Sequence, residues 1–404
     1  MSFQPPKGTD DILAPESQLW RLALGRWEEW AARYGYPLVM TPVLEATELF
    51  QRGVGESTEV VTKQMYTFTD KGGRSVTLRP EGTAGVVRAY LNSGQTGPWK
   101  GAYSGPFFRY ERPQAGRRRQ FWQVGVEYLD VVSPLADAEV IELAHRYLTD
   151  LGVSDLELVI NSLGDSACRP GYVEALKGYL RERVSQLSEN SVALIDVNPL
   201  RVLDSKADRP HLGDAPSPVD HLCEECRAHY EAVKTALDRL GVAYVEDPRL
   251  VRGLDYYTRT TFEFIARGLD AAQNAVGGGG RYDGLAETLG GRPAPGVGFA
   301  LGVDRIVLTL GETDTPYLAA YLISETGPED GLVVASALRR AGVRVDVDSE
   351  GRSVKAQFRA ARRRGSPVIL VWKGEDVPVS VQTSEGEQEM ALEEIPAWFE
   401  RRSR

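Results

Sequence analysis

The amino-acid sequence predicts an α+β protein in which an antiparallel sheet flanked by helices is interrupted by a helical insertion and followed by a small α/β domain. Three observations predict this fold. Residues 38–130 are mostly short apolar runs separated by turns, residues 164–244 have strong helical periodicity, and residues 317–404 alternate strand and helix patterns. We therefore expect one domain split between residues 1–163 and 245–313, with 164–244 inserted into it and 317–404 following.

The first element is a helix in the stretch APESQLWRLALGRWEEWAARYGYP. Its apolar side chains recur at helical spacing, and the glycine and proline of YGYP end it. The strand-like runs that follow are PLVMTPVLE, MYTFTD, SVTLRPE and FWQVGVEYLD, and their short turns favour antiparallel pairing. Helical periodicity returns in ADAEVIELAHRYLTDLGV.

From residue 164 onward the pattern changes. Two helical stretches, GYVEALKGYLRERVSQLS and CRAHYEAVKTALDRLGV, flank an irregular segment at 192–220. YTRTTFEFIA and NAVGGGGRYDGL then have strand and turn character, a helix is expected at 304–311, and DTP at 314–316 is typical of a linker. In the tail, LRRAGVRVDVD, a basic helix and SPVILVW predict a small α/β domain.

Composition restricts the class of protein. The chain has 47 lysines and arginines against 57 acidic residues, and its formal net charge of −10 opposes indiscriminate binding to nucleic acid. The N-terminal segment lacks the pattern of a secretory signal, and no stretch approaches the ~20 apolar residues of a membrane span. Three cysteines are too few for a disulfide framework and fit a reducing compartment. We therefore expect a cytoplasmic protein with no membrane segment.

Positive charge is concentrated in two places. The first is the stretch FFRYERPQAGRRRQFWQVGVE, which contains Arg109, Arg112, Arg117, Arg118 and Arg119. The second is RSVKAQFRAARRR, where side chains at spacings of three or four would share one helical face. That face either meets water or binds an anionic partner. Its members are Arg352, Lys355, Arg359 and Arg362.

Strand alternation sorts the first basic stretch into faces. In FFRYE, Arg109 and Glu111 would share one face. In FWQVGVEY, an apolar face carries Trp122, Val124, Val126 and Tyr128, and the other face carries Phe121, Gln123, Gly125 and Glu127. The polar face that contains Gln123 and Glu127 is unsuited to an apolar core but could line a ligand site, because Gly125 leaves room there. Two strands joined by an arginine loop suit a ligand that carries phosphate, although a polar face exposed to water would give the same pattern.

Three other stretches combine charge with a tight backbone. TLRPEGTAGVVRAY contains Glu81 and Thr83, LVRGLDYYTRTTFEF contains Arg252, and AVGGGGRYDGL has successive glycines at 277–280 that suggest close approach of a ligand or another backbone. No P-loop sequence is present. GVGFALG departs from the dinucleotide fingerprint and opens no βαβ unit, and Arg305 follows it.

Together these stretches resemble the class II aminoacyl-tRNA synthetases, and among them the histidyl-tRNA synthetase family. YGYPLVMTPVLE is similar to the first, dimer-forming motif of the class, FRYE with its basic loop and FWQVGVE to the second, and GVGFALGVDRI to the third. LVRGLDYYTRTTFEF and AVGGGGRYDGL resemble the two peptides peculiar to the histidyl family, and LRPEGTAGVVRAY and NPLRVLDSK agree. The resemblance covers nearly the whole chain, and residues 315–404 are its least typical part.

The resemblance implies a ligase that joins L-histidine and ATP into histidyl-adenylate and then transfers histidine to the 3′ end of tRNA(His). Such chemistry needs neutralised charge and two aligned anions, not a protein nucleophile. By resemblance, Arg109 and Arg252 would be the catalytic cations at the α-phosphate and the histidine carboxylate. ATP would be bound by Arg109, by Glu111 near the adenine, and by Arg117 and Arg305 at the outer phosphates, which Mg²⁺ would bridge.

Recognition of histidine is implied in the same way. Glu81, Thr83 and Gln123 match positions that hold the α-ammonium group, and Glu127 and Tyr257 match those that address the imidazole nitrogens. A neutral imidazole has one donor and one acceptor, so a carboxylate and a phenol can complement both. The implied histidine-binding residues are Glu81, Gly82, Thr83, Arg109, Gln123, Glu127, Arg252, Tyr256 and Tyr257.

The resemblance also implies partners. It predicts a homodimer, contact of the insertion with the tRNA acceptor stem, and anticodon recognition by the tail, whose basic helix would meet phosphate. No metal held by the protein is expected beyond the Mg²⁺ that accompanies ATP.

Two alternative functions share parts of the pattern. A non-catalytic regulatory subunit of ATP phosphoribosyltransferase, an enzyme of histidine biosynthesis, would resemble the core, but such proteins tend to lose RGLDYY and the tail domain. A synthetase for glycine, proline or threonine would share the class motifs without the two histidyl peptides.

HLCEECRAHY offers four side chains that can bind zinc, His221, Cys223, Cys226 and His229, within nine residues. Structural zinc ligands usually come as two pairs well separated in sequence, so the sequence favours an incidental cluster.

Overall fold

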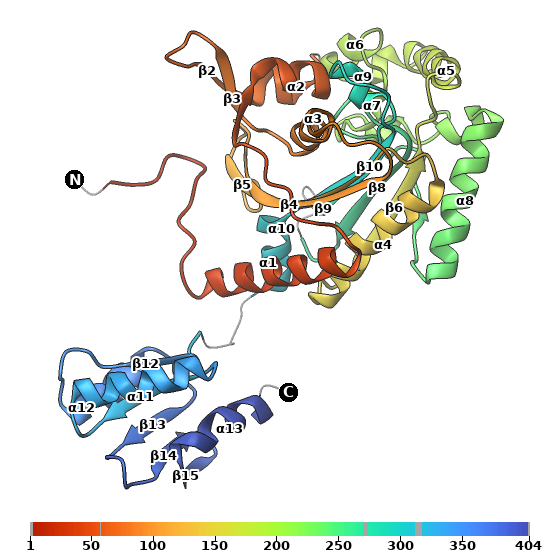
Figure 1. Ribbon diagram of the computed structural model, residues 1–404. Helices are drawn as coiled ribbons and strands as arrows, with labels where there is room; N and C mark the ends of the chain where they lie inside the picture. Colours follow the sequence, from red (N-terminus) through yellow and green to blue (C-terminus); the bar gives the residue numbers. More distant parts are fainter. Residues whose placement is uncertain (1–2, 57, 270–273, 312–316, 403–404) are drawn as a thin grey trace. The chain divides into compact units, whose positions relative to one another are not determined.

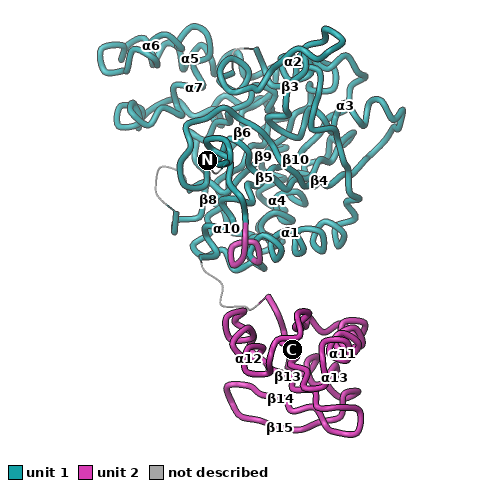
Figure 2. Tube along the Cα trace, turned by 90° about the vertical axis from the view of Figure 1, so that its left-hand side faces the viewer, with its two compact units in different colours: residues 1–12, 19–311 teal, residues 13–18, 312–404 magenta. Residues whose placement is uncertain are grey.

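The chain folds into two compact units, one of Met1–Ile12 with Leu19–Gly311 and one of Leu13–Gln18 with Glu312–Arg404 (Figure 2). The expected linker at 314–316 lies outside the described residues. The division of the first unit into a core and an inserted domain remains a prediction, as do its boundaries. The structure is a computed structural model that describes residues 3–56, 58–269, 274–311 and 317–402.

The first unit is built on a seven-stranded sheet with the strand order β4-β5-β10-β9-β8-β6-β7. Neighbouring strands pair antiparallel except β6 and β7, which are parallel. The sheet therefore brings together strands from both sides of the helical stretch in the middle of the chain. The strands are β4 Trp99–Phe108, β5 Gln120–Leu129, β6 Leu156–Ser162, β7 Val245–Glu246, β8 Thr258–Ala266, β9 Ala275–Arg281 and β10 Gly296–Gly302.

One face of this sheet packs against helices and forms the main apolar core. Val124 and Val126 of β5 are fully buried there, and Trp122 and Tyr128 pack against them, so the predicted apolar face of this strand is confirmed. Figure 1 shows α1 and α4 along this side of the sheet. The helices that contribute are α1 Glu16–Arg33, α4 Pro134–Asp150, α8 Glu224–Leu240 and α10 Val303–Leu310.

The opposite face of the sheet carries α3 and a small antiparallel sheet of order β1-β3-β2. Val87 and Tyr90 of α3 pack with Leu129 of β5 and with Tyr282, which follows β9. This packing holds the start of α3 over the polar face of β5. The elements here are β1 Leu44–Ala46, β2 Tyr66–Thr69, β3 Ser75–Leu78, α2 Thr47–Val54, α3 Thr83–Ser93, α9 Leu285–Thr288 and a π-helix at Val60–Gln64.

The two helical stretches predicted between residues 164 and 244 are present, two short helices lie between them, and these four helices pack in two groups. The first three form their own apolar cluster around Tyr172, Leu176 and Leu180. The fourth, α8, instead buries side chains such as Tyr230 and Leu237 in the main core, beside α4. The last helix of this stretch, α8, thus packs with the main core of the unit. The helices besides α8 are α5 Arg169–Arg181, α6 Glu189–Leu194 and α7 Leu200–Leu203, with 3-10 turns at Val184–Gln186, Arg209–His211 and Pro218–His221.

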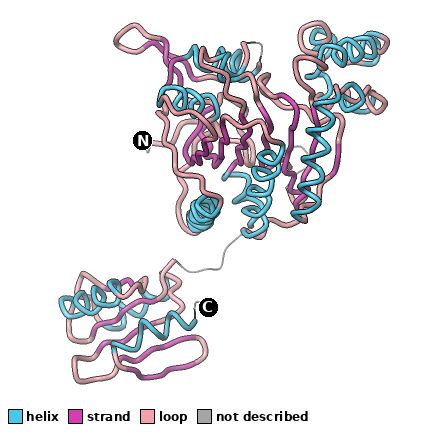
Figure 3. Tube along the Cα trace, turned by 45° about the vertical axis from the view of Figure 1, so that its right-hand side comes forward, coloured by secondary structure: helices cyan, strands magenta, loops and turns pink. Residues whose placement is uncertain are grey.

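The second unit is a five-stranded sheet of order β12-β11-β13-β14-β15 with helices on both faces (Figure 3). β11 pairs parallel with β12 and β13, and the remaining pairs are antiparallel. Apolar residues of α11 pack on one face and those of α12 on the other. The elements are β11 Ala320–Ser324, α11 Pro328–Arg340, β12 Val345–Val347, α12 Val354–Arg363, β13 Ile369–Trp372, β14 Val379–Thr383, β15 Gly386–Met390, a 3-10 turn Leu392–Glu394 and α13 Ile395–Arg402.

The predicted α+β class, with a mainly antiparallel sheet and a small C-terminal α/β unit, is confirmed. Among the described helices, none combines the length and the apolar character needed to cross a bilayer.

One detail of the basic stretch in the tail was predicted wrongly. Arg352 does not share a helical face with the other cations, because α12 begins only at Val354 and the Arg352 side chain turns back to pair with Asp348. Lys355, Arg359 and Arg362 do lie on α12 and are exposed.

Candidate active site

A cleft opens on the polar face of the seven-stranded sheet. Its walls come from the turn before α3, the loop between β4 and β5, the segment before β8, and the start of α10. Every substrate-site residue predicted in this unit lines the cleft except Glu127. Those that line it are Glu81, Gly82, Thr83, Arg109, Glu111, Arg117, Gln123, Arg252, Tyr256, Tyr257 and Arg305.

Two arginines from segments far apart in sequence lie in this cleft with their positions fixed by the protein. The Nε of Arg109 donates to the carbonyl oxygen of Pro80 at 2.9 Å, which leaves the rest of its guanidinium available to a ligand. The Nη1 of Arg252 lies 2.8 Å from Oε2 of Glu263, while its buried Nε has no hydrogen-bond partner among the described residues. Burial alone would lower the pKa of Arg252, but Tyr257 and Glu263 outweigh it and raise that pKa. Both side chains are therefore preorganised donors for an anion.

Two more arginines lie in the same cleft. The Nε of Arg305, on α10, donates to the carbonyl oxygen of Gly116 at 3.2 Å, and its Nη1 donates to that of Ala275. Burial lowers the pKa of this side chain, and the nearby Arg117 lowers it further. Arg117 is itself paired with Glu111, Nε to Oε2, at 2.9 Å. This clustering of like charges indicates that the cleft is built for a strongly anionic ligand.

The arginine loop between β4 and β5 is tied down on its outer side. Arg118 pairs with Asp10 at 2.9 Å and with Asp304 at 3.1 Å, and Asp304 also accepts the backbone N–H of Trp122 at 2.7 Å. The backbone N–H of Arg119 donates to the carbonyl oxygen of Gly8 at 2.7 Å. The N-terminal segment therefore braces the loop that carries the cleft cations.

The arginine loop also corrects a detail of the strand assignment. β4 ends at Phe108, so the expected face sharing of Arg109 and Glu111 does not arise from a strand. Their proximity comes from the loop, in which the backbone N–H of Glu111 donates to the carbonyl oxygen of Arg109 at 2.8 Å.

Next to the arginines lies a group suited to an ammonium ion. The carboxylate of Glu81, which is 4% exposed, accepts the backbone N–H groups of Thr83 and Ala84 at 2.7 and 3.0 Å. Burial raises the pKa of Glu81, and these two donors oppose the rise. The buried Oε1 of Gln123 has no hydrogen-bond partner among the described residues, so it is an acceptor without a donor. A buried acceptor left unpaired is costly unless a ligand supplies the donor.

Glu127 lies behind this group and not on the cleft surface. It is fully buried on β5, where Oε1 accepts from the hydroxyl of Thr83 at 2.8 Å and Oε2 accepts from the phenol of Tyr282. Burial raises the pKa of Glu127 to about 8, although the two hydroxyl donors lower it. Glu127 therefore contacts the cleft only through Thr83, whereas Tyr257, the partner with which it was predicted to address an imidazole ring, lines the cleft itself.

Two tyrosines form an aromatic wall of the cleft. The rings of Tyr256 and Tyr257 lie 4.7 Å apart between centroids, and Tyr256 meets Tyr282 edge-on at 5.6 Å. The guanidinium of Arg252 lies 5.8 Å from the ring of Tyr257. An apolar wall with a phenol and a cation at its edge can hold a small amino acid.

Glycines of the sheet make room for protein atoms more than for a ligand. A Cβ at Gly125 would lie 2.5 Å from the Tyr103 hydroxyl oxygen, so the space expected for a ligand is filled by that phenol. A Cβ at Gly278 would lie 2.8 Å from Nη1 of Arg252. Within the run at 277–280, only the first two glycines line the cleft, and a Cβ at Gly279 would meet the carbonyl oxygen of Gly298 at 2.0 Å. The close approach is mainly that of another strand, one of the two alternatives that the sequence left open.

Two residues of this site were missed from the sequence. Glu263, which fixes Arg252, lies between the buried Phe262 and Phe264 on β8, so strand alternation alone could have placed it on the polar face. Tyr282 carried no such signal, because its contact with Glu127 depends on how β9 ends beside β10.

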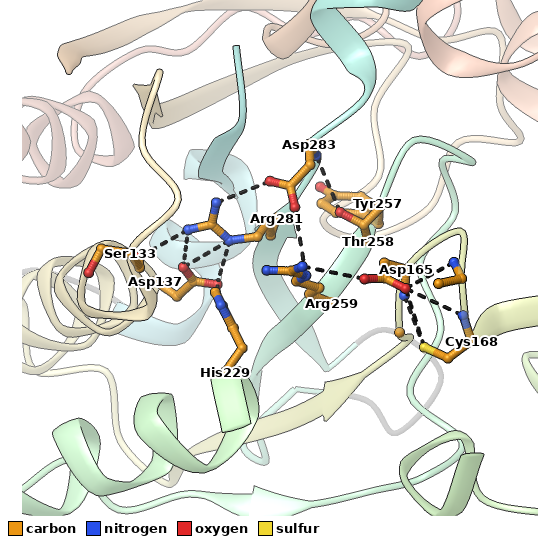
Figure 4. Close-up of polar contacts among 12 residues, drawn as sticks. Ser133, Asp137, Asp165, Cys168, His229, Tyr257, Thr258, Arg259, Arg281 and Asp283 are labelled. Atoms are coloured by element: carbon orange, nitrogen blue, oxygen red, sulfur yellow. Dashed lines mark hydrogen bonds and ion pairs between the residues drawn. The ribbon is translucent and has the colours of Figure 1, made fainter. Parts of the chain in front are cut away.

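The four zinc-binding candidates of HLCEECRAHY do not converge. His229 pairs with Asp137 at 3.2 Å, and the carboxylate of Asp137 also binds Arg281 (Figure 4). His221 lies against the ring of Tyr172, with centroids 5.6 Å apart. Of the four, only the two cysteines belong to a group of possible metal ligands in the described residues.

Comparison with known proteins identifies relatives over nearly the whole chain. A family model described as Histidyl-tRNA synthetase matches residues 8–306, and one described as Anticodon binding domain matches residues 321–402. A curated relative from Nocardia farcinica, named Histidine–tRNA ligase, is 49% identical over 389 residues, covering 93% of this chain and 91% of the relative. One of the same name from Desulforudis audaxviator is 48% identical over 387 residues, covering 93% and 92%.

Solved structures agree with these relatives. The crystal structure of apo histidyl-tRNA synthetase from S. aureus has a TM-score of 0.78 at 36% identity and covers 98% of this chain and 100% of that chain. A structure described as an ATP phosphoribosyltransferase regulatory subunit/histidyl-tRNA synthetase from Bacillus halodurans has a TM-score of 0.67 at 22% identity, covering 93% and 99%, and shows a shared fold alone.

Proposed function

The chain belongs to the histidyl-tRNA synthetase family, and from that premise we propose how its cleft activates L-histidine with ATP and passes the histidyl group to the 3′ end of tRNA(His). One observation carries this proposal. Arg109, Arg117, Arg252 and Arg305 line a single cleft beside the unpaired acceptor of Gln123, so a polyphosphate and an amino acid can be held side by side.

The reaction needs two anions brought together. The carboxylate oxygen of histidine attacks the α-phosphorus of ATP, the bond to the β-phosphate oxygen breaks, and pyrophosphate leaves. Arg109 and Arg252 stabilise the charge that develops on the α-phosphoryl oxygens, and because the protein already fixes them they need no reorganisation during the step. Arg117 and Arg305 hold the β- and γ-phosphates. In the second step the terminal ribose hydroxyl of the tRNA attacks the histidyl carbonyl carbon and AMP leaves.

Magnesium would enter with ATP. Mg²⁺ prefers oxygen ligands and usually binds through substrate phosphates with one or two carboxylates. Glu111 and Glu263 line the cleft beside the arginines and offer such carboxylates, so the residues present fit the ion. When bound, Mg²⁺ neutralises charge on the outer phosphates.

Histidine is held by the amino-acid side of the cleft. Gln123 Oε1 and the Glu81 carboxylate accept from its α-ammonium group, and Tyr257 contacts its imidazole ring. Glu127 acts through Thr83, because it accepts a hydrogen bond from the Thr83 hydroxyl and so fixes the direction of that hydroxyl at the amino-acid end of the site. Ligands that lack the matching donors leave these buried groups unpaired, which is the basis of rejection.

The second unit would bind tRNA. Its match to an anticodon-binding domain and the exposed cations Lys355, Arg359 and Arg362 on α12 support contact with the RNA backbone. Arg352, already paired with Asp348, is a weaker candidate. Bases of a single-stranded anticodon loop would be read by the rest of this unit.

We further propose that the protein is a cytoplasmic homodimer. Leu38, Met40 and Leu44, in the segment similar to the dimer-forming motif, are 61%, 83% and 48% exposed, and such apolar side chains favour burial against a partner. The cysteines are free, as expected in a reducing compartment. Sedimentation of the Met40→Glu variant beside the unmodified protein tests this proposal. The variant should contain a larger fraction of monomer, because a charge at this position disfavours burial of the patch against a partner.

A non-catalytic regulatory role is not favoured. The relatives at 48% and 49% identity are ligases, and the catalytic arginines Arg109 and Arg252 are present in the cleft. ATP–pyrophosphate exchange across the twenty amino acids tests the proposal. We expect exchange with histidine alone. No exchange with any amino acid would support the regulatory role, and exchange with glycine, proline or threonine would support a different specificity.

A further inference from the structure

A second cluster of reactive side chains lies outside the cleft, where the chain enters α5 and where it enters α8. Asp165 and Cys168 stand just before α5, and Cys223 and Cys226 stand at the start of α8. One carboxylate oxygen and three thiol sulfurs from these residues all lie within 4.8 Å of one another. Three cysteines and an aspartate so close together form the donor set of a tetrahedral zinc site.

We propose that Asp165, Cys168, Cys223 and Cys226 bind one Zn²⁺ in a structural site that joins the start of α5 to the start of α8. The sequence alone disfavoured zinc because His221, Cys223, Cys226 and His229 form only one short run. The structure supplies the missing second pair, since the spacing of 165–168 matches that of 223–226 and residues 169–222 separate the pairs. Two pairs well apart in sequence are the usual arrangement of a structural zinc site.

The geometry needs little change to accept the ion. Zinc–sulfur bonds of about 2.3 Å in a tetrahedron place the ligand atoms roughly 3.8 Å apart, so the four atoms would contract by about 1 Å. The cluster is enclosed, because Cys226 is fully buried and the other three ligands are partly buried. With four protein ligands and no open position, the ion would hold the fold together and take no part in the reaction.

The surroundings of Asp165 support its role as a ligand. Its Oδ1 accepts the backbone N–H of Ala167 at 3.0 Å, and its Oδ2 lies 3.3 Å from Nη2 of Arg259 (Figure 4). A ligand carboxylate is normally oriented by such partners. Three thiolates and one carboxylate would leave the zinc complex with two net negative charges. Arg259 directly compensates part of this charge.

The cluster also connects to the cleft. Arg169, which follows Cys168, donates through its guanidinium to the backbone carbonyl oxygens of Leu163 and Tyr257. The zinc site would therefore help to fix the backbone at Tyr257, a residue that lines the cleft. This role is separate from adenylation and does not depend on the proposed function.

Metal analysis of the full-length protein, purified with reductant and without chelator, tests the proposal. After incubation with excess zinc and gel filtration, the wild-type chain should retain about one equivalent of zinc. Cys168→Ser and Cys223→Ser should each lose it, and both should melt at a lower temperature than the wild type. His221→Gln is the matched control, because it removes a neighbouring zinc-binding side chain that the proposal leaves out, and it should keep its zinc.

A second measurement covers the case in which the serine variants fail to fold. Cobalt added to the reduced wild-type protein should give the intense visible absorption of tetrahedral cobalt bound by thiolates, and zinc should displace it. The proposal is overturned if the reduced wild-type protein retains no zinc and gives no cobalt–thiolate band. A disulfide found by mass spectrometry between two of these cysteines in such a sample would not rescue it. Zinc retention unchanged by Cys168→Ser, or lost in His221→Gln, would overturn the ligand set. Histidine-dependent exchange is measured separately, so its failure would be distinct.

Discussion

The cleft of the first unit and the basic face of α12 in the second both gather positive side chains, but they hold them differently. Arg109, Arg252 and Arg305 are fixed by carbonyl oxygens or a carboxylate. On α12, neither Arg359 nor Arg362 makes an ion pair or side-chain hydrogen bond recorded among the described residues, and both are exposed.

A fixed, partly buried cation and an exposed, unpaired cation contribute to ligand binding in different ways. A cation fixed in a partly buried cleft keeps its strength, because the surroundings screen it little and its position needs no ordering when the ligand arrives. An exposed cation on a helix is screened by salt and contributes mainly by releasing counterions from a polyanion. We therefore expect the cleft to govern the rate of adenylation and α12 to govern the affinity for tRNA.

The largest effect is expected at Arg252. Arg252→Ala should lower kcat/KM for histidine-dependent ATP–pyrophosphate exchange by roughly 10²-fold or more, because in the proposed mechanism its guanidinium stabilises charge on the α-phosphate. Arg249→Ala is a suitable control, since that side chain pairs with Asp247 nearby and does not line the cleft. A near-normal rate for Arg252→Ala would remove this residue from the mechanism and weaken the contrast between the two regions.

A smaller effect is expected at Gln123. Gln123→Leu should raise the KM for histidine by about 10-fold to 100-fold with little change in the KM for ATP, because one hydrogen bond to a charged ammonium is lost. Steady-state exchange with each substrate varied in turn gives both values. Equal changes in the two KM values would place this amide elsewhere than at the amino-acid end.

Charge reversal on α12 tests the other side of the comparison. Arg359→Glu with Arg362→Glu should weaken tRNA binding by about 10-fold at moderate salt and flatten its salt dependence, with exchange unchanged. Arg340→Glu on α11, which packs on the opposite face of the sheet, is the control. Filter binding over a range of salt concentrations measures both quantities. Unchanged tRNA affinity would make this surface an ordinary solvated one.

A further prediction concerns stability and not activity, at Glu127, whose pKa rises from 4.5 to about 8 on burial. The folded protein keeps a proton here that the unfolded chain releases, so this group makes the protein less stable as pH rises from 4.5 toward 8. The loss should amount to about 1 kcal/mol per pH unit within that window. Glu127→Gln should remove this slope in thermal unfolding followed across the pH range, and a slope identical to the wild type would contradict the raised pKa.

Much of the fold could be predicted from periodicity. The first helix, the apolar face of β5 and the alternation in the tail all depend on local spacing, and the structure agrees with them. The cleft residues came instead from resemblance, and the structure brings all but Glu127 onto one surface. What periodicity could not supply was contact between distant segments, because spacing along the chain carries no information on which strands become neighbours.

The exceptions at Gly125 and at the cysteines share this cause, whereas the exception at Arg352 is local. Gly125 was expected to leave space for a ligand, but the space belongs to Tyr103 of the adjacent strand. Arg352 was expected on the basic helix. That helix, α12, begins only at Val354 after its N-cap Ser353, and the Arg352 side chain pairs with Asp348. Cys223 and Cys226 formed only one short run in the sequence, but the fold places Asp165 and Cys168 beside them.

The bracing of the arginine loop by Gly8 and Asp10 has a practical consequence. Residues near the start of the chain hold in place a loop that lies much later in the sequence and carries cations of the cleft. We expect a truncation at that end, or a bulky fusion placed against it, to weaken the binding of ATP although it removes none of the residues that line the cleft.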